Sequence, residues 1–288
     1  MQTMIEMRSP AKINLVLDVL AKRADGFHEI RSLMIKVGLY DRLVVEPGRA
    51  GVIELTCNSD EVPTDQQNLI YRAADCLARE MGCLPGCRIH LEKAIPVGGG
   101  MGGGSSNAAA VLRALNRLWD AHIDDARLAE LGSTLGSDVP FFFAAEGAIV
   151  SGRGDCVLPV RLAFAGWAVL VFGGVHVSTP QVYAYCTPQS PESFRDNLNE
   201  LAGIPGADEM RSALRNGLES GVFAVSAHMR ALYERVERAA GRPMRISGAG
   251  SVLFDVFDTA EQAEAFVREL QSHGITQEIR VVRAPVSE

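Results

Sequence analysis

A glycine-rich stretch is the part of this sequence with the most specific chemistry. Residues 98–104 contain six glycines in seven positions, and Ser105 and Ser106 follow directly. Because glycine has no Cβ, the backbone N–H groups of such a loop can converge on one anionic oxygen. An amphipathic helical pattern begins at Asn107, and the unpaired N–H groups of its first turn favour an anion at the same place. The pattern predicts a phosphate-binding loop. The alternative is a flexible linker, which is disfavoured because an amphipathic helix follows the loop directly.

Two familiar kinds of phosphate loop do not fit this stretch. Gly98, Gly100 and Gly103 satisfy the spacing GxGxxG, but the acidic residue expected ~20 positions later falls near Asp120, at the end of the predicted helix. This position disfavours a dehydrogenase that transfers hydride from a dinucleotide. The Walker A loop also fails, because no lysine follows the glycines and the nearest one, Lys93, precedes them. A phosphate loop of another lineage is required.

Composition limits the classes of ligand and the compartment. The 288 residues carry a formal net charge of -7, which argues against nucleic acid as a partner because that affinity depends on surplus lysine and arginine. No run approaches the ~18 to 20 apolar residues of a membrane span, and residues 1–8 lack the apolar region of a secretory signal. We therefore expect a cytoplasmic protein that does not associate with membranes.

The cysteines indicate reduced thiols and not a disulfide framework, since the six of them are scattered through a chain of moderate length. Cys83, Cys87 and His90 could begin a metal site. A zinc site normally needs a fourth ligand, and neither cysteine belongs to a CxxC pair, so a turn leading into a strand is favoured. The sequence assigns no metal ligands.

Hydrophobic periodicity predicts helices and strands that alternate without a strict βαβ rhythm, which favours an α+β fold. We expect two domains, residues 1–158 and residues 159–288, with the boundary near residues 158–164. The predicted strands are 13–20, 43–46, 52–57, 88–93, 167–172, 244–246, 252–257 and 276–282, with an extended apolar segment at 141–143; the predicted helices are 68–81, 107–119, 125–135, 222–239 and 259–273.

Three segments are distinctive as a set: residues 9–15 (Ser-Pro-Ala-Lys-Ile-Asn-Leu), residues 96–109 and residues 247–254 (Ser-Gly-Ala-Gly-Ser-Val-Leu-Phe). In this order and spacing they resemble the GHMP kinase family, which includes galactokinase, homoserine kinase, mevalonate kinase and phosphomevalonate kinase. The resemblance implies a nucleotide-binding N-terminal domain and a ferredoxin-like, substrate-binding C-terminal domain, with the active site in the cleft between them. It also implies a kinase that uses ATP together with Mg2+.

Further segments narrow the resemblance: residues 23–28 (Arg-Ala-Asp-Gly-Phe-His), the triple-glycine form of the loop, and residues 135–140 (Leu-Gly-Ser-Asp-Val-Pro). They are similar to the family members of non-mevalonate isoprenoid synthesis, in which ATP phosphorylates the tertiary 2-hydroxyl of a small molecule that carries a cytidine diphosphate group. Another GHMP kinase, acting on homoserine, mevalonate or a sugar, is the alternative. A regulatory module that binds ATP without turnover is disfavoured because Lys12 and Asp138 are both present. The oligomeric state stays open, and a homodimer is one candidate.

The resemblance implies catalytic roles for two residues. Asp138 corresponds to the family's catalytic aspartate, as a general base or as the group that orients the hydroxyl, and its place before Val139-Pro140 predicts an extended backbone. A turn-forming or capping aspartate is the alternative. Lys12 corresponds to the family's lysine, whose ammonium can hydrogen-bond Asp138 and approach the transferred phosphoryl group.

Other residues are expected around the two substrates. Phe27 and Tyr183 would stack on the cytosine, although many aromatic side chains simply pack in cores. His28 would hydrogen-bond the edge of the base, with Asn14 and Thr179 beside the substrate. Ser105 and Ser106 would contact phosphates or Mg2+, or act as an ordinary N-cap. Asn216 receives no role, since residues 216–219 are Asn-Gly-Leu-Glu where the family often has Asn-Asp-Leu-Glu. The expected nucleotide-binding residues are Asn68, Lys93, Pro96, Gly98, Gly99, Gly100, Gly102, Gly103, Gly104, Ser105 and Ser106.

Overall fold

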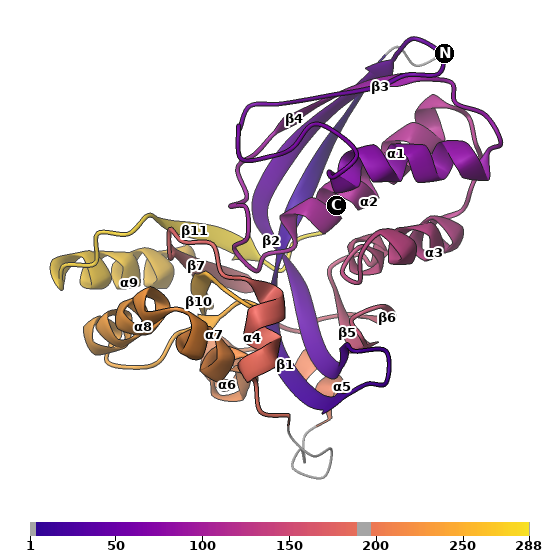
Figure 1. Cartoon of the computed structure of the whole chain (residues 1–288). Coiled ribbons are helices and arrows are strands. Elements are labelled where there is room, and N and C mark those ends of the chain that lie inside the picture. Colours follow the sequence, from indigo (N-terminus) through magenta and orange to yellow (C-terminus); the bar gives the residue numbers. More distant parts are fainter. Residues whose placement is uncertain (1–3, 189–196, 288) are drawn as a thin grey trace.

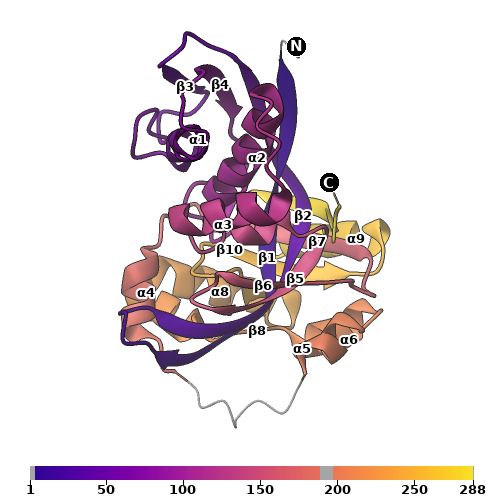
Figure 2. The same ribbon diagram turned by 90° about the vertical axis from the view of Figure 1, so that its right-hand side faces the viewer.

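A long β-hairpin runs through the whole molecule (Figures 1 and 2). The computed structural model describes residues 4–188 and 197–287. Strands β1 (Ile5–Lys22) and β2 (His28–Pro47) pair antiparallel along nearly their full length. Because both strands are buried over most of that length, the hairpin can bear other elements on both of its faces.

The hairpin is the centre of a sheet that has seven strands in the described part of the chain. One half of β2 pairs with β4 (Cys87–Glu92), which pairs with β3 (Ile53–Cys57). The other half of β2 pairs with β5 (Gly147–Gly152), which pairs with β6 (Cys156–Val160), and the short β8 (Arg215–Asn216) lies beside β1. The helices that pack on this sheet are α1 (Leu69–Glu80), α2 (Gly103–Leu118), α3 (Asp125–Leu135) and the 3-10 helix η1 (Pro140–Phe143).

A second, four-stranded antiparallel sheet has the order β11-β7-β10-β9. In chain order its strands are β7, β9, β10 and β11, with α8 directly before β9 and α9 between β10 and β11, which gives the βαββαβ arrangement of a ferredoxin-like fold, as predicted. Its strands are β7 (Gly166–Phe172), β9 (Arg245–Ile246), β10 (Val252–Phe257) and β11 (Ile279–Ala284), and the two helices are α8 (Ala227–Ala240) and α9 (Ala260–Ser272). Between β7 and α8 lie α4 (Thr179–Tyr185), α5 (Leu198–Ala202), α6 (Ala207–Ala213) and α7 (Glu219–Val225).

The two sheets share a core because the central strands of the second sheet, β7 and β10, are buried on both faces. Ala168, Leu170 and Phe172 belong to the cluster that includes β1 and β2, whereas Val169 and Val171 pack with α8 and α9. This alternation follows from the two-residue period of a strand. The shared core places β1, and with it Lys12, at the junction of the two sheets.

A buried carboxylate ties the hairpin to β8. Asp18 of β1 accepts hydrogen bonds from Arg31 Nη2 at 2.9 Å and from Arg215 Nε at 2.7 Å. Arg31 belongs to β2 and Arg215 to β8, so this one side chain connects three strands of the first sheet. Charges that leave water need such compensation, and the cluster therefore anchors β8 beside β1.

Several predicted elements are correct in type but wrong in extent. The predicted strands 13–20 and 43–46 are parts of the much longer β1 and β2, and β5 and β6 were not predicted. The predicted helix 222–239 is divided into α7 and α8, since Ser226 leaves the helical conformation and its side chain accepts a hydrogen bond from the Met229 N–H as an N-cap. The domain boundary at residues 158 and 159 stays a prediction. Within the described ranges, no helix combines the length and the apolar character needed to cross a membrane.

Replacing Asp18 with asparagine is expected to lower the free energy of unfolding by about 3 kcal/mol, because the change removes the charge that compensates Arg31 and Arg215. Urea unfolding measures this effect. Asp75→Asn is the matched control, since it removes only an exposed ion pair with Arg79 and should cost less than about 0.5 kcal/mol. Equally small losses in both variants would show that the Asp18 cluster contributes no particular stability.

Candidate active site

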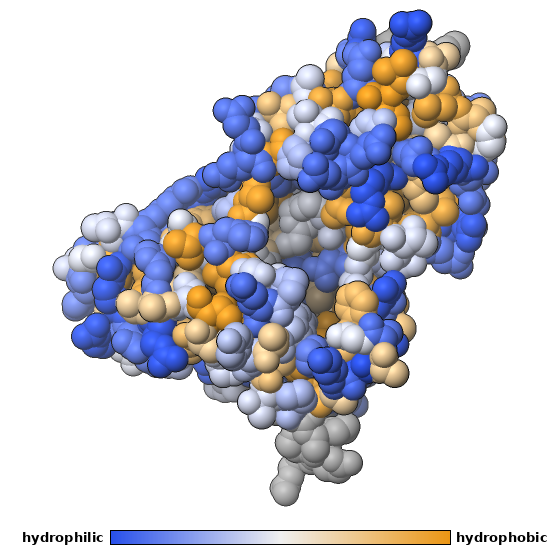
Figure 3. All heavy atoms as spheres, in the orientation of Figure 1, coloured by the Kyte–Doolittle hydropathy of each residue, from blue (hydrophilic) through white to orange (hydrophobic). Residues whose placement is uncertain are grey.

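Three cavities follow one another along the junction of the two sheets. The loop cavity, of about 350 Å³, lies beside the glycine loop, the central cavity has about 240 Å³, and the outer cavity has about 420 Å³. Gly100 and Gly102 line both the loop and the central cavity, while Asp138, Thr179 and Tyr183 line both the central and the outer cavity. The space-filling view shows the surface hollowed between the part with α2 and α3 and the part with α4 (Figure 3).

The glycine loop, residues 98–104, has a backbone that glycine adopts more readily than any other residue. Gly98, Gly100 and Gly102 have φ angles of 70°, 72° and 70°. At Gly100 an added Cβ would lie 2.1 Å from the carbonyl oxygen of Ser247, so no side chain fits there. Gly102 is the N-cap of α2, which places the unpaired N–H groups of the first helical turn beside the loop cavity. The loop and the helix end together can receive an anion.

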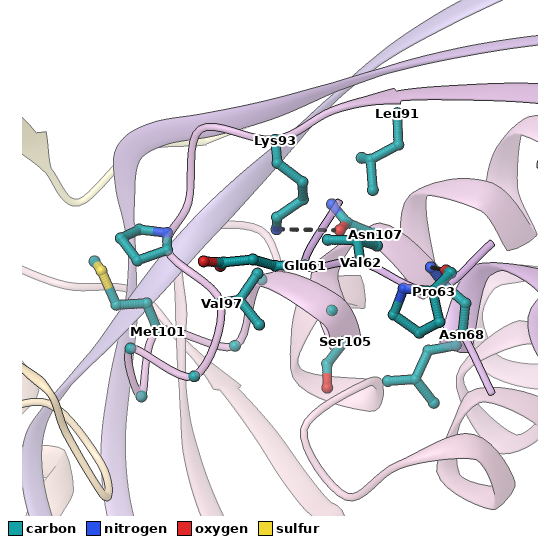
Figure 4. Close-up of a pocket in the computed structure, with 18 of the residues that line it drawn as sticks. Glu61, Val62, Pro63, Asn68, Leu91, Lys93, Val97, Met101, Ser105 and Asn107 are labelled. Atoms are coloured by element: carbon teal, nitrogen blue, oxygen red, sulfur yellow. Dashed lines mark hydrogen bonds between the residues drawn. The ribbon is translucent and has the colours of Figure 1, made fainter. Parts of the chain in front are cut away.

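Most of the predicted nucleotide-binding residues surround the loop cavity. In Figure 4, Val97 and Met101 lie at one end of it and Pro63 and Asn68 at the other, with Lys93 along one side. Asn68 also caps α1, because its side chain accepts a hydrogen bond from the N–H of Ile70. The predicted residues that line this cavity are Asn68, Lys93, Pro96, Gly98, Gly99, Gly100, Gly102, Gly103, Gly104 and Ser105.

Ser106 does not line the loop cavity and belongs instead to a buried polar network at the start of α2. Lys93 and Asn107 both donate to the carboxylate of Asp41, which is fully buried. Asn107 also donates to Ser9 Oγ at 2.9 Å, and Ser9 Oγ donates to Ser106 Oγ at 2.7 Å. The network fixes the first turn of α2. Neither Ser105 nor Ser106 is the N-cap of α2, because Gly102 occupies that position.

Lys12 is the cation of the central cavity. Its side chain is only 5% exposed, and Nζ donates to Asn14 Oδ1 at 2.6 Å. The distance from Nζ to Asp138 Oδ2 is 3.8 Å, so these two groups form an ion pair but not the predicted hydrogen bond, because Asn14 is the acceptor. Burial lowers the pKa of Lys12, and the charge of Asp138 partly opposes that shift. A bound phosphate would supply further negative charge.

Asp138 stands on a turn and not on the predicted extended backbone. Val139 has φ of -62° and ψ of -45°, and its N–H donates to the Gly136 carbonyl oxygen at 3.2 Å. Pro140 begins η1, so residues 141–143, predicted to be extended, are also helical. Val139 is completely buried, and its packing outweighs the usual preference of a residue before proline. The turn leaves the Asp138 side chain 32% exposed, facing the central and outer cavities.

The outer cavity contains the predicted aromatic residues. Phe27 is 51% exposed, which excludes a core role for it. The ring that stacks on Tyr183 is His28, with centroids 5.1 Å apart, so the predicted placement of Phe27 and Tyr183 on the two faces of a base stays a prediction. Burial and the charge of Lys22 lower the pKa of His28, which keeps the imidazole neutral at pH 7.

Sequence reasoning missed three residues of this site. Asp41 holds Lys93 and Asn107 in the network described above, Arg153 lines the outer cavity with its guanidinium 5.5 Å from the Phe27 ring centroid, and Ser247 Oγ donates to the Gly100 carbonyl oxygen at 3.1 Å. Only Ser247 lay in a segment that the motifs had marked. An acidic residue inside an apolar strand, as at Asp41, was the available signal for a buried ion pair.

The site contains no preformed metal centre among the described residues, since they include no group of three or more His, Cys, Asp or Glu side chains placed to hold an ion. Cys83, Cys87 and His90, which are among the described residues, form no such group, and burial raises the pKa of Cys87 to about 12. Mg2+ keeps several waters and commonly binds through one or two protein groups and substrate phosphates. The described site therefore fits an Mg2+ ion that would bind together with the phosphates of a nucleotide.

Comparisons with known proteins agree with this geometry. Residues 68–146 match the GHMP kinases N terminal domain, and residues 186–276 match the family described as GHMP kinases C terminal. A 4-diphosphocytidyl-2-C-methyl-D-erythritol kinase of Symbiobacterium thermophilum is 44% identical over 215 residues, which cover 74% of this chain and 72% of that protein. Another, of Geobacter sp., is 36% identical over 279 residues, with 93% and 94% covered.

Solved structures show the same relationship. The crystal structure of a 4-(cytidine 5'-diphospho)-2C-methyl-D-erythritol kinase has a TM-score of 0.75 and 36% identity, and covers 97% of this chain and 98% of that chain. Homoserine kinase from Cytophaga hutchinsonii, at 17% identity and a TM-score of 0.75, shares the fold. This fold, with a glycine loop beside a Lys–Asp pair, is that of an ATP-dependent phosphotransferase. The chain belongs to the GHMP kinase family and, within it, to the family of 4-diphosphocytidyl-2-C-methyl-D-erythritol kinases.

Replacing Gly100 with alanine is expected to weaken ATP binding about tenfold or more, equivalent to ~1.4 kcal/mol, because the Cβ would collide with the backbone of Ser247 and displace the loop. Calorimetric titration with ATP measures the affinity. Gly82→Ala is the control, since Gly82 has a similar φ of 68° but open space around it. Unchanged affinity in a folded Gly100→Ala variant would mean that the loop does not hold the phosphates.

Proposed function

We propose that this kinase transfers the terminal phosphoryl group of ATP to the 2-hydroxyl of 4-diphosphocytidyl-2-C-methyl-D-erythritol, in the non-mevalonate route to isoprenoid precursors. The observation that carries the proposal is the series of three cavities with Lys12 and Asp138 in the middle one. ATP occupies the loop cavity with its phosphates on residues 98–104. The cytidine occupies the outer cavity, and the two substrates meet in the central cavity.

In the reaction, the substrate hydroxyl oxygen forms a bond to the γ-phosphorus while the bond from that phosphorus to the β–γ bridging oxygen breaks. Asp138 accepts the hydroxyl proton, and ADP is the leaving group. Lys12 stabilises the charge on the transferred group, and Asn14 holds its ammonium in place. Mg2+ would add positive charge at the phosphates, and Ser105, which lines the loop cavity, could contact either the ion or a phosphate.

The cytosine lies between Phe27 and Tyr183 on this proposal, and His28 hydrogen-bonds its edge. Because His28 stacks on Tyr183 in the structure, the imidazole must move aside when the base enters. Thr179 lines both the central and the outer cavity, where it can contact the phosphate groups of the substrate. All these residues come from one chain, so the proposal requires no partner subunit, and a homodimer stays a prediction.

Asp138→Asn is expected to lower kcat by roughly 10² to 10⁴, since an amide cannot accept the hydroxyl proton. The dissociation constant of ATP should stay within about threefold, because the aspartate lies outside the loop cavity. A coupled assay of ADP release measures kcat. The double variant with Lys12→Ala should lose less than the product of the single effects if the two residues act as a unit. Turnover within about threefold of the native enzyme would remove Asp138 from the mechanism.

Phe27→Ala and Tyr183→Ala are each expected to raise the KM for the cytidylyl substrate about tenfold, because stacking on a base contributes ~1 to 3 kcal/mol. ATP affinity should not change. Tyr185→Ala is the control for Tyr183→Ala. Tyr185 lies on α4 together with Tyr183, is 64% exposed and does not line the outer cavity. Free methylerythritol phosphate, which has no base, should be a poor substrate. An enzyme that phosphorylates both compounds equally well would contradict the cytidine pocket and point to another GHMP activity.

A further inference from the structure

Asn216 stands out among the buried polar residues, because its side chain holds three backbone groups next to the central cavity. Nδ2 donates to the carbonyl oxygen of Ile246 at 2.8 Å and to that of Gly248 at 2.7 Å. Oδ1 accepts from the N–H of Leu218 at 2.8 Å. Because the residue is buried, solvent cannot substitute for these hydrogen bonds if they are lost. One amide therefore fixes the start of the segment 247–251, here called the 247–251 loop.

The 247–251 loop contacts both halves of the catalytic machinery. An added Cβ at Gly248 would lie 3.3 Å from Lys12 Nζ and 3.6 Å from Asn14 Oδ1, so the loop backbone forms the wall behind the ammonium. Ser247 Oγ donates to the Gly100 carbonyl oxygen at 3.1 Å. A displacement of this loop would thus change the space around the Lys12 ammonium on one side and disturb the bond to the glycine loop on the other.

The segment that contains Asn216 is held in place by β1, the strand that carries Lys12. Its strand, β8, pairs parallel to β1 at Val16 and Leu17, and the Gly217 N–H donates to the Leu17 carbonyl oxygen at 2.7 Å. The neighbouring Arg215 is bonded to Asp18. Hydrogen bonds therefore connect β1 to the segment of Asn216 and Asn216 to the 247–251 loop, and Gly248 of that loop lies next to the Lys12 ammonium.

We infer that Asn216 is a positioning residue for phosphoryl transfer, which acts by setting the 247–251 loop against the Lys12 ammonium. It touches neither the proposed substrate nor ATP in the assigned cavities, since it lines none of the three. Its effect falls on the group that stabilises the transferred phosphoryl, and a small misplacement of such a group slows the reaction strongly. The expected effect on the reaction rate rests on the proposed function. The expected change in the surroundings of Lys12 does not.

The test compares Asn216→Asp with Asn116→Asp. The first change keeps the acceptor for the Leu218 N–H but removes both donated bonds, which go to the carbonyl oxygens of Ile246 and Gly248. Asn116 is the control, because its amide likewise bridges backbone groups, donating to the Ile123 carbonyl oxygen at 2.7 Å and accepting from the Ile123 N–H at 3.0 Å, and it lines none of the three cavities. Asn216→Asp loses two donated bonds and Asn116→Asp loses one, so the melting temperatures of both variants are needed to separate general destabilisation from a positioning effect.

Asn216→Asp is expected to lower kcat about 10- to 100-fold with the KM for the acceptor within about threefold, while Asn116→Asp keeps kcat within about twofold. Acylation of lysines followed by mass spectrometry gives a readout that needs no substrate. The chain has only four lysines, so Lys12 can be followed against the exposed Lys22 as an internal standard. Labelling of Lys12 should rise severalfold in Asn216→Asp and stay unchanged in Asn116→Asp.

If Asn216→Asp does not fold, Gly248→Ala tests the same contact from the other side, since its Cβ would press on Lys12 and on the Gly100 carbonyl oxygen. It should lower kcat while Asn216 keeps its bonds. Native kcat and native Lys12 labelling in the folded variants would overturn the inference and leave Asn216 a purely structural residue. Increased Lys12 labelling in Asn216→Asp, together with a native enzyme that does not phosphorylate the cytidylyl substrate, would refute the proposed function alone.

Discussion

The backbone of Gly100 lies against the backbone of Ser247 and Gly250, and no side chain could be accommodated at that contact. Gly100 belongs to the glycine-rich segment that leads into α2, whereas Ser247 and Gly250 belong to the one that leads into β10. Phosphoryl transfer depends mainly on positioning and on charge, so the two segments must be held at a fixed distance. The glycine loop connects β4 of the first sheet to α2, and residues 247–251 connect β9 to β10 of the second sheet. The packing of the two sheets therefore holds the two segments in contact.

The long hairpin accounts for how two sheets can place these segments so closely. Strands β1 and β2 belong to the first sheet, and their apolar residues also pack on β7 and β10 of the second. A shared core of this kind leaves little freedom for the sheets to shift, since protein interiors are close-packed. Lys12 lies on this hairpin where the two sheets meet, and it lines the central cavity together with Gly248 and Ala249, which precede β10.

The two lysines near the glycine loop have different electrostatic environments, and the difference separates a structural role from a proposed chemical one. Lys93 pairs with the fully buried carboxylate of Asp41, which also accepts from the N–H groups of Ala94 and Ile95. That ammonium is fully compensated within the protein. Lys12 is 3.8 Å from a carboxylate that is partly exposed, and burial lowers its pKa. A buried cation with a distant counter-charge favours an anionic ligand, which suits it to the transferred phosphoryl group.

The sequence by itself determined the chemistry that is local along the chain. Residues 98–104 need no tertiary contact to expose backbone N–H groups, and the amphipathic patterns of α1, α2 and α9 follow from spacing alone. Hydrophobic periodicity predicted the α+β fold class, and three short motifs, each local in the chain, predicted the family. The long β1 and β2 were underestimated, because strand length depends on partners that periodicity does not reveal.

Only the tertiary structure decided which side chains meet. Val139 is helical before a proline because it is buried, and Lys12 bonds Asn14 and not Asp138 because the strand places the amide closer. Asn216, to which the sequence assigned no role, is bonded to a carbonyl 32 residues later in the chain. Contacts between residues so distant along the chain are set by the packing of the two sheets, and no local pattern of residue types encodes them.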